Sequence, residues 1–282
     1  MKMITVGSLF AGIGGLDLGL ERAGMQVRWQ VENNSYCIRV LEKHWPKVKR
    51  YGDIKQIKWA EVEPVDLICG GFPCQPVSVA GSQKGDKDDR WLWPEFLRAI
   101  REIRPKYAIV ENVPGLLSTD SGRLMGQVLG DLALCGYDAE WDCISAASVG
   151  AWHRRDRIFI VAYRKNTGVV GRFRFTADDT SSSCEGEVDT RRSGIHDELP
   201  TIPDTNTEGL EGLRPECKLS QVGKEESVGR GGQWVVEPDV GRVAHGVPSR
   251  VDRLKCLGNA VVPQVAELIG RLIVQQEMAV GD

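Results

Sequence analysis

The stretch "SLFAGIGGLDLGLERAG", residues 8–24, joins the end of an apolar, strand-like run to a segment with helical periodicity. Gly12, Gly14 and Gly15 form the turn between the two. Glycines at a strand-to-helix turn let the backbone approach a ligand, and the helix amino terminus offers unpaired N–H groups to a carboxylate or phosphate. Tight packing of a strand on a helix needs glycine too, so the turn alone predicts a βα unit and leaves a ligand open.

Strand-like and helical segments continue to alternate on both sides of this turn. After residue 24 the strand-like runs are "MQVRWQVE", "VDLICGGF" and "YAIVENV", and the helical segments are "NSYCIRVLEKHW" and "WPEFLRAIREI". Two further strand-like runs, "GYDAEWDCISAASVG" and "RRDRIFIVAYR", are separated by a turn region, which favours an antiparallel pair at the edge of the sheet. We therefore predict an α/β fold with a mostly parallel sheet, an antiparallel edge and helices on both faces.

Composition divides the chain into three parts. Residues 166–235 are rich in Gly, Ser, Thr, Asp, Glu and Arg and poor in large apolar residues, unlike the parts before and after them. We expect residues 1–165 to form the main domain and residues 166–235 to form a small irregular lobe or a partly disordered insertion. Residues 236–282 regain helical periodicity, and we expect them to return to the main domain.

Charge, hydropathy and cysteine usage narrow the class of protein. The 282-residue chain has a net charge of −3, so the whole molecule is not a strongly basic nucleic-acid binder. No apolar run reaches the length of a membrane span, and the first residues do not have the pattern of a signal peptide. We therefore expect a cytoplasmic protein that does not bind a membrane. Eight cysteines without a C-x-x-C pair, and four histidines without ligand spacing, predict neither a disulfide framework nor a metal site.

Glu32 and Asp53 follow the second and third strand-like runs. We expect both to lie at the same edge of the sheet as the glycine turn. Glu32 stands at the end of the second strand, where a carboxylate can bind both hydroxyls of a ribose. Asp53 follows a possible third strand, where it can accept a hydrogen bond from an adenine amino group. Together with the glycine turn, these positions predict a pocket for an adenosine-type cofactor.

Cys74 lies in "GGFPCQPVSVAG", residues 70–81, directly after the next strand. Pro73 and Pro76 stiffen this loop, and we expect Gly70 and Gly71 to leave room beside the thiol. A buried structural cysteine gains nothing from this arrangement, whereas a nucleophile gains because its attacking atom is already oriented.

Glu111 in "ENV" ends the following strand, where it can face Cys74 across the same crevice. A carboxyl group there can assist a thiolate that attacks an electron-poor ring, provided that the pKa of the carboxyl group is raised. The alternative is that Glu111 is a surface glutamate at the end of a strand. Arg155 and Arg157 in "HRRDRIFIVA" have the spacing of one strand face, and two guanidinium groups there can bind a phosphate or carboxylate and lower the pKa of a thiol. The alternative is that the two arginines lie at a charged, solvent-exposed strand end.

Taken together, these motifs resemble the DNA (cytosine-5) methyltransferases over about residues 4–164 and 238–278. The resemblance implies a Rossmann-like S-adenosylmethionine-dependent methyltransferase fold, with S-adenosyl-L-methionine as methyl donor and S-adenosylhomocysteine as product. It also implies double-stranded DNA as partner, with the target cytosine flipped out of the helix. The motifs that carry it are, in order, "FAGIGG", "VEN", "GDI", "GGFPCQ", "ENV", "HRRDRIFIVA" and "GNAVVP".

Carried over residue by residue, the resemblance makes Cys74 the nucleophile on cytosine C6 and Glu111 the partner of N3 and the exocyclic amine. Arg155, and to a lesser degree Arg157, would orient the base and the catalytic loop. The residues that would line the cofactor pocket are Phe10, Gly12, Ile13, Gly14, Glu32, Asn33, Asp53, Ile54, Pro73, Leu92, Asn259 and Val261.

The resemblance assigns target recognition to residues 166–235, whose arginines (Arg172, Arg174, Arg191, Arg192 and Arg230) can contact phosphates or guanine edges. His153 stands where the family usually has glutamine. We expect a monomer with a possible cognate restriction endonuclease that is not physically required. An RNA cytosine-5 methyltransferase and a DNA-binding relative without catalysis stay open as alternatives.

Overall fold

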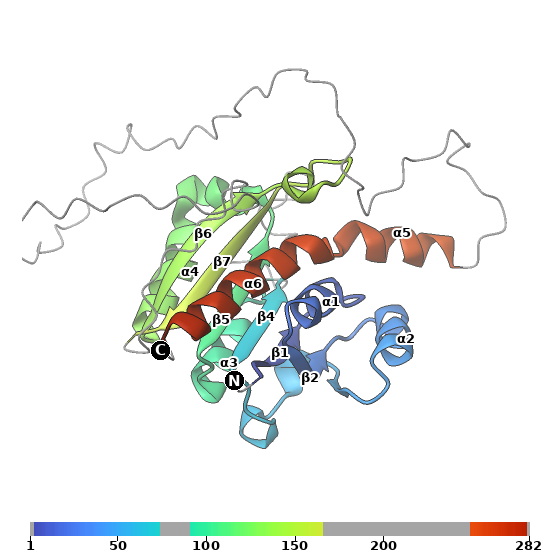
Figure 1. Cartoon of the computed structure of the whole chain (residues 1–282), viewed down its shortest axis with the longest axis horizontal. Coiled ribbons are helices and arrows are strands. Elements are labelled where there is room, and N and C mark those ends of the chain that lie inside the picture. The colour runs from blue at the N-terminus through green and yellow to red at the C-terminus, as the bar shows by residue number, and fades with distance from the viewer. Residues whose placement is uncertain (1–2, 74–90, 166–248, 281–282) are drawn as a thin grey trace, which may run out of the picture. The chain divides into compact units, whose positions relative to one another are not determined.

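The computed structural model of the chain describes residues 3–73, 91–165 and 249–280 (Figure 1). All of these belong to one compact unit, Met1–Ala177 with Trp234–Asp282. Cys74 and the predicted recognition region 166–235 lie outside the described residues. The strands are β1 (Thr5–Leu9), β2 (Gln26–Val31), β3 (Lys49–Tyr51), β4 (Leu67–Gly71), β5 (Tyr107–Asn112), β6 (Tyr137–Ile144) and β7 (Arg157–Arg164). The α-helices are α1 (Gly15–Arg22), α2 (Ser35–His44), α3 (Trp93–Ile103), α4 (Arg123–Leu134), α5 (Arg250–Asn259) and α6 (Pro263–Val280).

The seven strands form one sheet in the order β3-β2-β1-β4-β5-β7-β6. The pairs from β3 to β5 are parallel, and β7 runs antiparallel to both β5 and β6. The predicted α/β fold with a mostly parallel sheet and an antiparallel edge is confirmed. Because β1 to β5 are parallel, the residues that follow them gather at one edge of the sheet.

The central strands are buried on both faces, which explains why they read as nearly continuous apolar runs. In β5, Ala108 and Val110 pack in one core cluster, whereas Tyr107 and Ile109 pack in the other. This alternation follows from the two-residue period of a strand. The side chains of β7 divide in the same way, so one sheet supports two hydrophobic layers.

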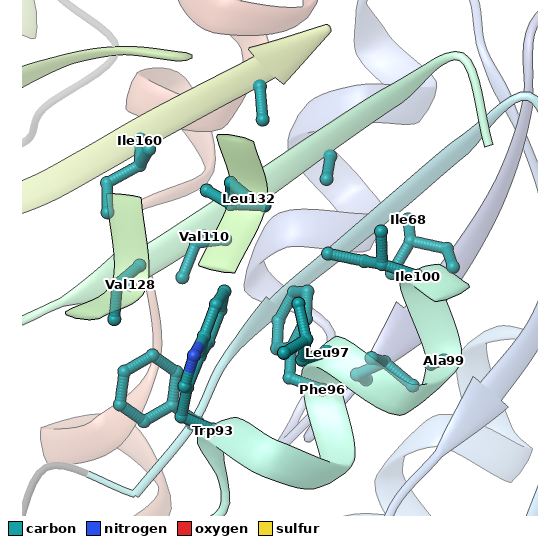
Figure 2. Packing of buried hydrophobic residues seen from close by; sticks show 14 of the residues in the cluster. Ile68, Trp93, Phe96, Leu97, Ala99, Ile100, Val110, Val128, Leu132 and Ile160 are labelled. Atoms are coloured by element: carbon teal, nitrogen blue, oxygen red, sulfur yellow. The ribbon is translucent and has the colours of Figure 1, made fainter. Parts of the chain in front are cut away.

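Helices α3 and α4 cover the first face. Trp93 and Phe96 of α3 are fully buried, and their stacked rings have centroids 5.7 Å apart. Figure 2 shows them close to Val128 of α4 and to Val110 of β5. The strongly amphipathic sequence "WPEFLRAIREI" has a proline in the first turn, where proline is favoured because its missing N–H would have no partner in the helix.

Helices α1 and α6 cover the second face, although about 240 residues separate their sequences (Figure 1). Gly19 of α1 lets the backbones approach, because a Cβ there would overlap the carbonyl oxygen of Pro263. Ala266, Ile269 and Ile273 of α6 are buried against this face. The expected return of the C-terminal segment to the first part of the chain therefore takes the form of helix-on-helix packing.

Within the described ranges, one helical stretch, Arg250–Ala279, is long and apolar enough by length and composition to cross a membrane. Inspection of the sequence did not anticipate this. The stretch comprises α5 and α6, which a non-helical connection at residues 260–262 separates. One face of α6 packs on α1 and on the sheet.

Candidate functional site

The glycine turn between β1 and α1 is shaped by backbone conformations that L-residues rarely adopt. Gly12 has φ +57° and Gly14 has φ +85°, and Phe10 also lies in the left-handed region at φ +51°. A Cβ on Gly14 would overlap the Trp45 ring, and one on Gly15 would overlap the backbone of Val261. A Cβ on Gly12 would meet no atom closer than 4.0 Å, so it is Gly12 whose surroundings leave space for a ligand.

Glu32 lies beside this turn, directly after β2. Its Oε2 accepts a hydrogen bond from Gly12 N at 2.7 Å, and its Oε1 accepts from Asn33 N at 2.9 Å and Asn34 N at 2.8 Å. Three backbone donors therefore hold the carboxylate in one orientation between the glycine turn and the start of α2. The structure places Glu32 where the sequence predicts a ribose-binding carboxylate, and that role stays a prediction.

The other predicted pocket residues lie around the same sheet edge in different settings. Asp53 caps a 3-10 turn by accepting from Lys55 N at 3.0 Å, and the side chain of Ile54 is in the core. Phe10 packs against Phe96, with ring centroids 6.4 Å apart. Pro73 and Leu92 are half-buried and flank residues 74–90, and Asn259 is the exposed last residue of α5.

Some of the predicted site residues line one of two hollows, whereas Gly12 and Glu32 line neither of them. A cavity of about 910 Å³ is lined by Ile13, Gly14, Val261, Arg155 and Arg157. A smaller hollow of about 360 Å³ includes Asp53. The large cavity therefore joins the glycine turn to the arginines, while Asp53 belongs to a separate depression.

Glu111 stands at the carboxyl end of β5, opposite Gly71 of β4. A Cβ on Gly71 would overlap Oε2 of Glu111, so this glycine makes room for the carboxyl group. The expectation that Gly70 and Gly71 leave room beside the thiol lies partly outside the described residues, but at Gly71 the space is occupied by Glu111. Burial raises the pKa of Glu111 to about 7, and the positive charges of Arg157 and Arg155 oppose that rise.

The two arginines do not share a strand face, which corrects the prediction from their spacing. Arg157 begins β7, and its Nε lies 3.2 Å from Oε1 of Glu111. Arg155 precedes the strand in the left-handed region, at φ +43°, so the two-residue period of a strand does not apply to it. Its Nη2 donates to the carbonyl oxygens of Gly258 and Ala260, at 2.7 Å each.

Asn112 and the Phe72–Trp91 ring pair are supporting residues that sequence reasoning missed. Asn112, the residue that follows Glu111, is buried, and its Nδ2 donates a hydrogen bond to Phe72 O at 3.3 Å. The Phe72 and Trp91 rings meet edge to face, with centroids 5.1 Å apart. These contacts anchor both ends of the segment that contains Cys74. In the sequence, the asparagine in "ENV" and the aromatic residues at both ends of that segment are the features that could have indicated these contacts.

A buried polar network below the glycine turn was also missed. Asp17 in the first turn of α1 is fully buried, and it accepts from Ser8 Oγ at 2.9 Å and from Gln30 Nε2 at 2.8 Å. Burial raises the pKa of Asp17 to about 6, against the lowering effect of these two hydrogen bonds. An aspartate inside an apolar helical pattern, "GLDLGL", is the signal that could have identified it.

In the three described ranges, His, Cys, Asp and Glu side chains form no group of three or more that could hold a metal ion. The large cavity is lined by glycines, aromatic and aliphatic side chains, the two guanidinium groups, two histidines and the carboxyl group of Glu21. This donor set suits an organic ligand with an anionic group.

Comparison with known proteins places this arrangement in context. The family described as C-5 cytosine-specific DNA methylase matches residues 4–230. The Type II methyltransferase M.Eco47II of Escherichia coli is 39% identical over 169 residues, which cover 58% of this chain and 40% of that protein. M.NgoFVII of Neisseria gonorrhoeae is 35% identical over 164 residues, covering 57% and 44%, and M.HhaI of Haemophilus parahaemolyticus is 33% identical over 162 residues, covering 57% and 49%.

Solved structures show the same fold. A DNA modification methyltransferase encoded within an E. coli prophage, a function assigned to it provisionally, is 27% identical with a TM-score of 0.50, covering 57% of this chain and 47% of that one. DNMT2 of Spodoptera frugiperda is 21% identical with a TM-score of 0.51, covering 61% and 54%. The matched part of this chain spans less than half the length of each of these curated relatives.

Proposed function

The chain belongs to the C-5 cytosine-specific DNA methylase family, and on this premise we propose that it methylates carbon 5 of cytosine in double-stranded DNA. The observation that carries the proposal is Glu111, a nearly buried carboxyl group whose pKa is raised to about 7, next to the end of β4, the strand that precedes Cys74 in the sequence. A carboxyl group that holds a proton near neutral pH suits a step that shares a proton with a ring nitrogen.

S-adenosylmethionine would supply the electrophilic methyl group when bound. The residues around the glycine turn fit such a cofactor: the surroundings of Gly12 are open, the carboxylate of Glu32 is fixed beside it, and the adjoining cavity has a volume of about 910 Å³. A ligand pocket usually has a volume of roughly 300–1,000 Å³. We assign the ribose to Glu32, and the glycine turn and Val261 to the remainder of the cofactor. We assign the adenine side to Asp53 on the sequence resemblance alone, because Asp53 lines the separate, smaller hollow.

The chain's own residues would carry the reaction on the base. The thiolate of Cys74 adds to C6, because C5 of cytosine is a poor nucleophile until the ring becomes enamine-like. Glu111 shares its proton with N3 and stabilises the charge that develops on the ring, while Arg157 orients the Glu111 carboxyl group. After C5 is methylated, a solvent base removes the C5 proton, and the electron pair of that bond re-forms the C5=C6 double bond and expels the Cys74 thiolate. The proton on N3 returns to Glu111. The base must leave the duplex for this, at a cost of a few kcal/mol.

The relatives named above are Type II methyltransferases, which supports a role in restriction and modification. In that role the methyl mark protects DNA from a cognate endonuclease, and the methyltransferase acts as a monomer without binding that enzyme. Residues 166–235 would read the sequence around the target cytosine.

The test is methyl transfer from labelled S-adenosylmethionine to unmethylated duplex DNA of mixed sequence, followed by bisulfite sequencing of the product. We expect protected cytosines within one short sequence motif. Cys74→Ser should abolish transfer while cofactor binding, measured by calorimetry, stays nearly unchanged. Cys143→Ser is the matched control, because Cys143 is a half-buried cysteine on the edge strand β6.

Three outcomes would contradict parts of this proposal. Turnover by the Cys74→Ser variant would exclude Cys74 as the nucleophile. Incorporation into RNA, and not into DNA, would change the substrate class. Binding of DNA and cofactor without any methyl transfer would identify a relative that has lost catalysis.

A further inference from the structure

Arg155 has an unusual place for a residue next to a strand. Its backbone adopts a left-handed conformation, at φ +43°, which disfavours residues with a Cβ. Such conformations persist only where surrounding contacts hold them, and they concentrate at functional sites. Here the conformation directs the guanidinium toward a segment more than 100 residues further along the chain.

That segment is the end of α5 and the connection to α6. The last carbonyl groups of a helix have no partner within the helix, and a cation near them is favourable. The backbone N–H of Ala260 closes α5 by donating to Cys256 O at 3.0 Å. Arg155 donates hydrogen bonds to the carbonyl oxygens of Gly258 and Ala260, so the guanidinium group satisfies acceptors at the end of α5 and just after it.

The next residue after Ala260 touches the cofactor side of the fold. Val261 packs so closely on Gly15 that a Cβ on Gly15 would overlap the Val261 backbone. Val261 also lines the large cavity together with Gly14. A continuous series of contacts therefore runs from Arg155 through Ala260 and Val261 to the glycine turn.

Arg157 has a different partner, since its Nε lies 3.2 Å from Glu111 Oε1. The two guanidinium groups thus face different parts of the site, one toward the carboxyl group and one toward the C-terminal connection. A second contact, between the buried Cys37 and Cys256 thiols at 3.2 Å, fixes α5 to α2 but lies within the helix and away from the connection itself. Arg155 is therefore the side chain best placed to control residues 260–262.

We propose that Arg155 is a positioning residue that holds the Ala260–Val261 backbone against the glycine turn and thereby fixes one wall of the cofactor pocket. The proposal rests on the proposed function, because it takes the cofactor to be S-adenosylmethionine. It assigns Arg155 to cofactor binding, in place of the contact with the target base that the sequence resemblance implies.

The experiment compares the full-length wild-type chain with Arg155→Lys and Arg155→Gly. Lysine keeps the charge without the planar fork, and glycine removes the side chain at a backbone position that favours glycine, so strain and side-chain loss are separated. Arg154→Lys is the matched control, because Arg154 is an exposed neighbour whose Nη2 lies 3.1 Å from Asp156. Arg157→Lys tests the other guanidinium.

The first measurement is hydrogen exchange of the Ala260 and Val265 amides in protein without ligand. We expect faster exchange in both Arg155 variants and no change in Arg154→Lys or Arg157→Lys. The second measurement is the Kd for S-adenosylmethionine by calorimetry, which should rise about tenfold in the Arg155 variants, as loss of a charge-assisted hydrogen bond predicts. The Kd of Arg155→Lys for duplex DNA should stay within about threefold, a change worth less than about 1 kcal/mol.

Unchanged exchange at Ala260 in both Arg155 variants would overturn the proposal. So would an unchanged Kd for S-adenosylmethionine combined with weaker DNA binding or slower methyl transfer, which is the pattern of a residue that contacts the base. If the wild-type chain bound no S-adenosylmethionine, the proposed function would fail. The exchange measurement would still decide whether Arg155 holds the connection.

Discussion

Glu111 is a carboxyl group whose pKa the fold raises toward neutral pH. Its side chain is 13% exposed, and burial raises its pKa to about 7 although two guanidinium groups lie near it. Desolvation therefore outweighs the attraction of the neighbouring positive charges. The raised pKa depends on Gly71, because any larger residue there would displace the carboxyl group from its position between the strands.

We predict that the proton-dependent part of methyl transfer is lost as pH rises through about 7. A carboxyl group with a raised pKa is protonated below that pKa, so a proton-sharing Glu111 is active on the acid side and inactive on the basic side. Replacement of Arg157 by Gln removes a charge that lowers this pKa, so the midpoint should move to higher pH. Single-turnover rates between pH 5.5 and 9 would measure both effects.

Glu111→Gln is the control for this titration, because it keeps the shape of the side chain and cannot transfer a proton. Its rate should fall by a factor of roughly 10²–10⁴, the usual contribution of general acid–base catalysis. Every other titrating group is the same in the two proteins, so the ratio of the two pH profiles isolates Glu111. A ratio that does not change with pH would remove Glu111 from the proton-sharing role.

Helix α1 combines two features that the glycine turn alone does not reveal. Its first turn buries Asp17 between Ser8 of β1 and Gln30 of β2, and Gly19 on a later turn packs on α6. Each Asp17 oxygen has a side-chain donor, yet burial still raises the pKa of this carboxyl group to about 6. The ionised form is therefore less favourable in the folded protein than in the unfolded chain.

We predict that Asp17→Asn stabilises the protein above pH 6. The folded pKa of about 6 exceeds the ordinary value of 3.8, so wild-type stability should decrease as pH rises between about 4 and 6. The difference corresponds to at most about 3 kcal/mol at pH 8, at roughly 1.4 kcal/mol per pKa unit. Asparagine can accept from Gln30 and donate to Ser8 Oγ, so the network is kept. Urea unfolding at several pH values measures the change.

Asp142→Asn serves as the matched control because Asp142 is exposed on the edge strand β6. Its Oδ1 accepts from Cys143 N, and asparagine can keep this bond. Stability in this variant should follow the wild type at every pH. Loss of stability at pH 8 in Asp17→Asn would show that the fold uses the charged form of Asp17.

At the scale of the whole molecule, the beginning and end of the described chain form one core. Val265, Ala266, Ile269 and Ile273 of α6 are buried in the same cluster as Leu20 of α1. The carboxyl group of Glu277 accepts from the Tyr107 hydroxyl at 2.6 Å, which ties the end of α6 to the start of β5. Residues 1–165 are therefore not a self-sufficient domain in this structure.

We predict that a fragment of residues 1–165 lacks a stable fold. Burial of the Val265, Ile269 and Ile273 side chains contributes roughly 4.5–9 kcal/mol at about 1.5–3 kcal/mol each, and the smaller Ala266 side chain adds about 0.8 kcal/mol. Natural domains have a total stability of roughly 5–15 kcal/mol, so this loss is decisive. The fragment should bind a hydrophobic dye and unfold without a sharp transition. Addition of a peptide of residues 249–282 should restore cooperativity, whereas full-chain stability in the fragment alone would contradict the prediction.

The sequence by itself determined the local elements and the identity of the motif residues. Alternating strand and helix periodicities predicted the sheet, and the glycines after the first strand-like run predicted the β1–α1 turn. These features follow from interactions between neighbours in the chain, which a sequence displays directly. The prediction that Arg155 and Arg157 share a strand face was wrong. It required a strand that contains both residues, whereas β7 begins at Arg157.

Only the tertiary structure decided which motif residues touch. Gly71 lies opposite Glu111 because β4 pairs with β5, and Val261 lies on Gly15 because α6 packs against α1. Arg155 finds its partners on Gly258 and Ala260 because the α5–α6 connection returns to the loop before β7. Strand order and helix packing are set by burial of apolar surface over the whole chain, so no short pattern contains them.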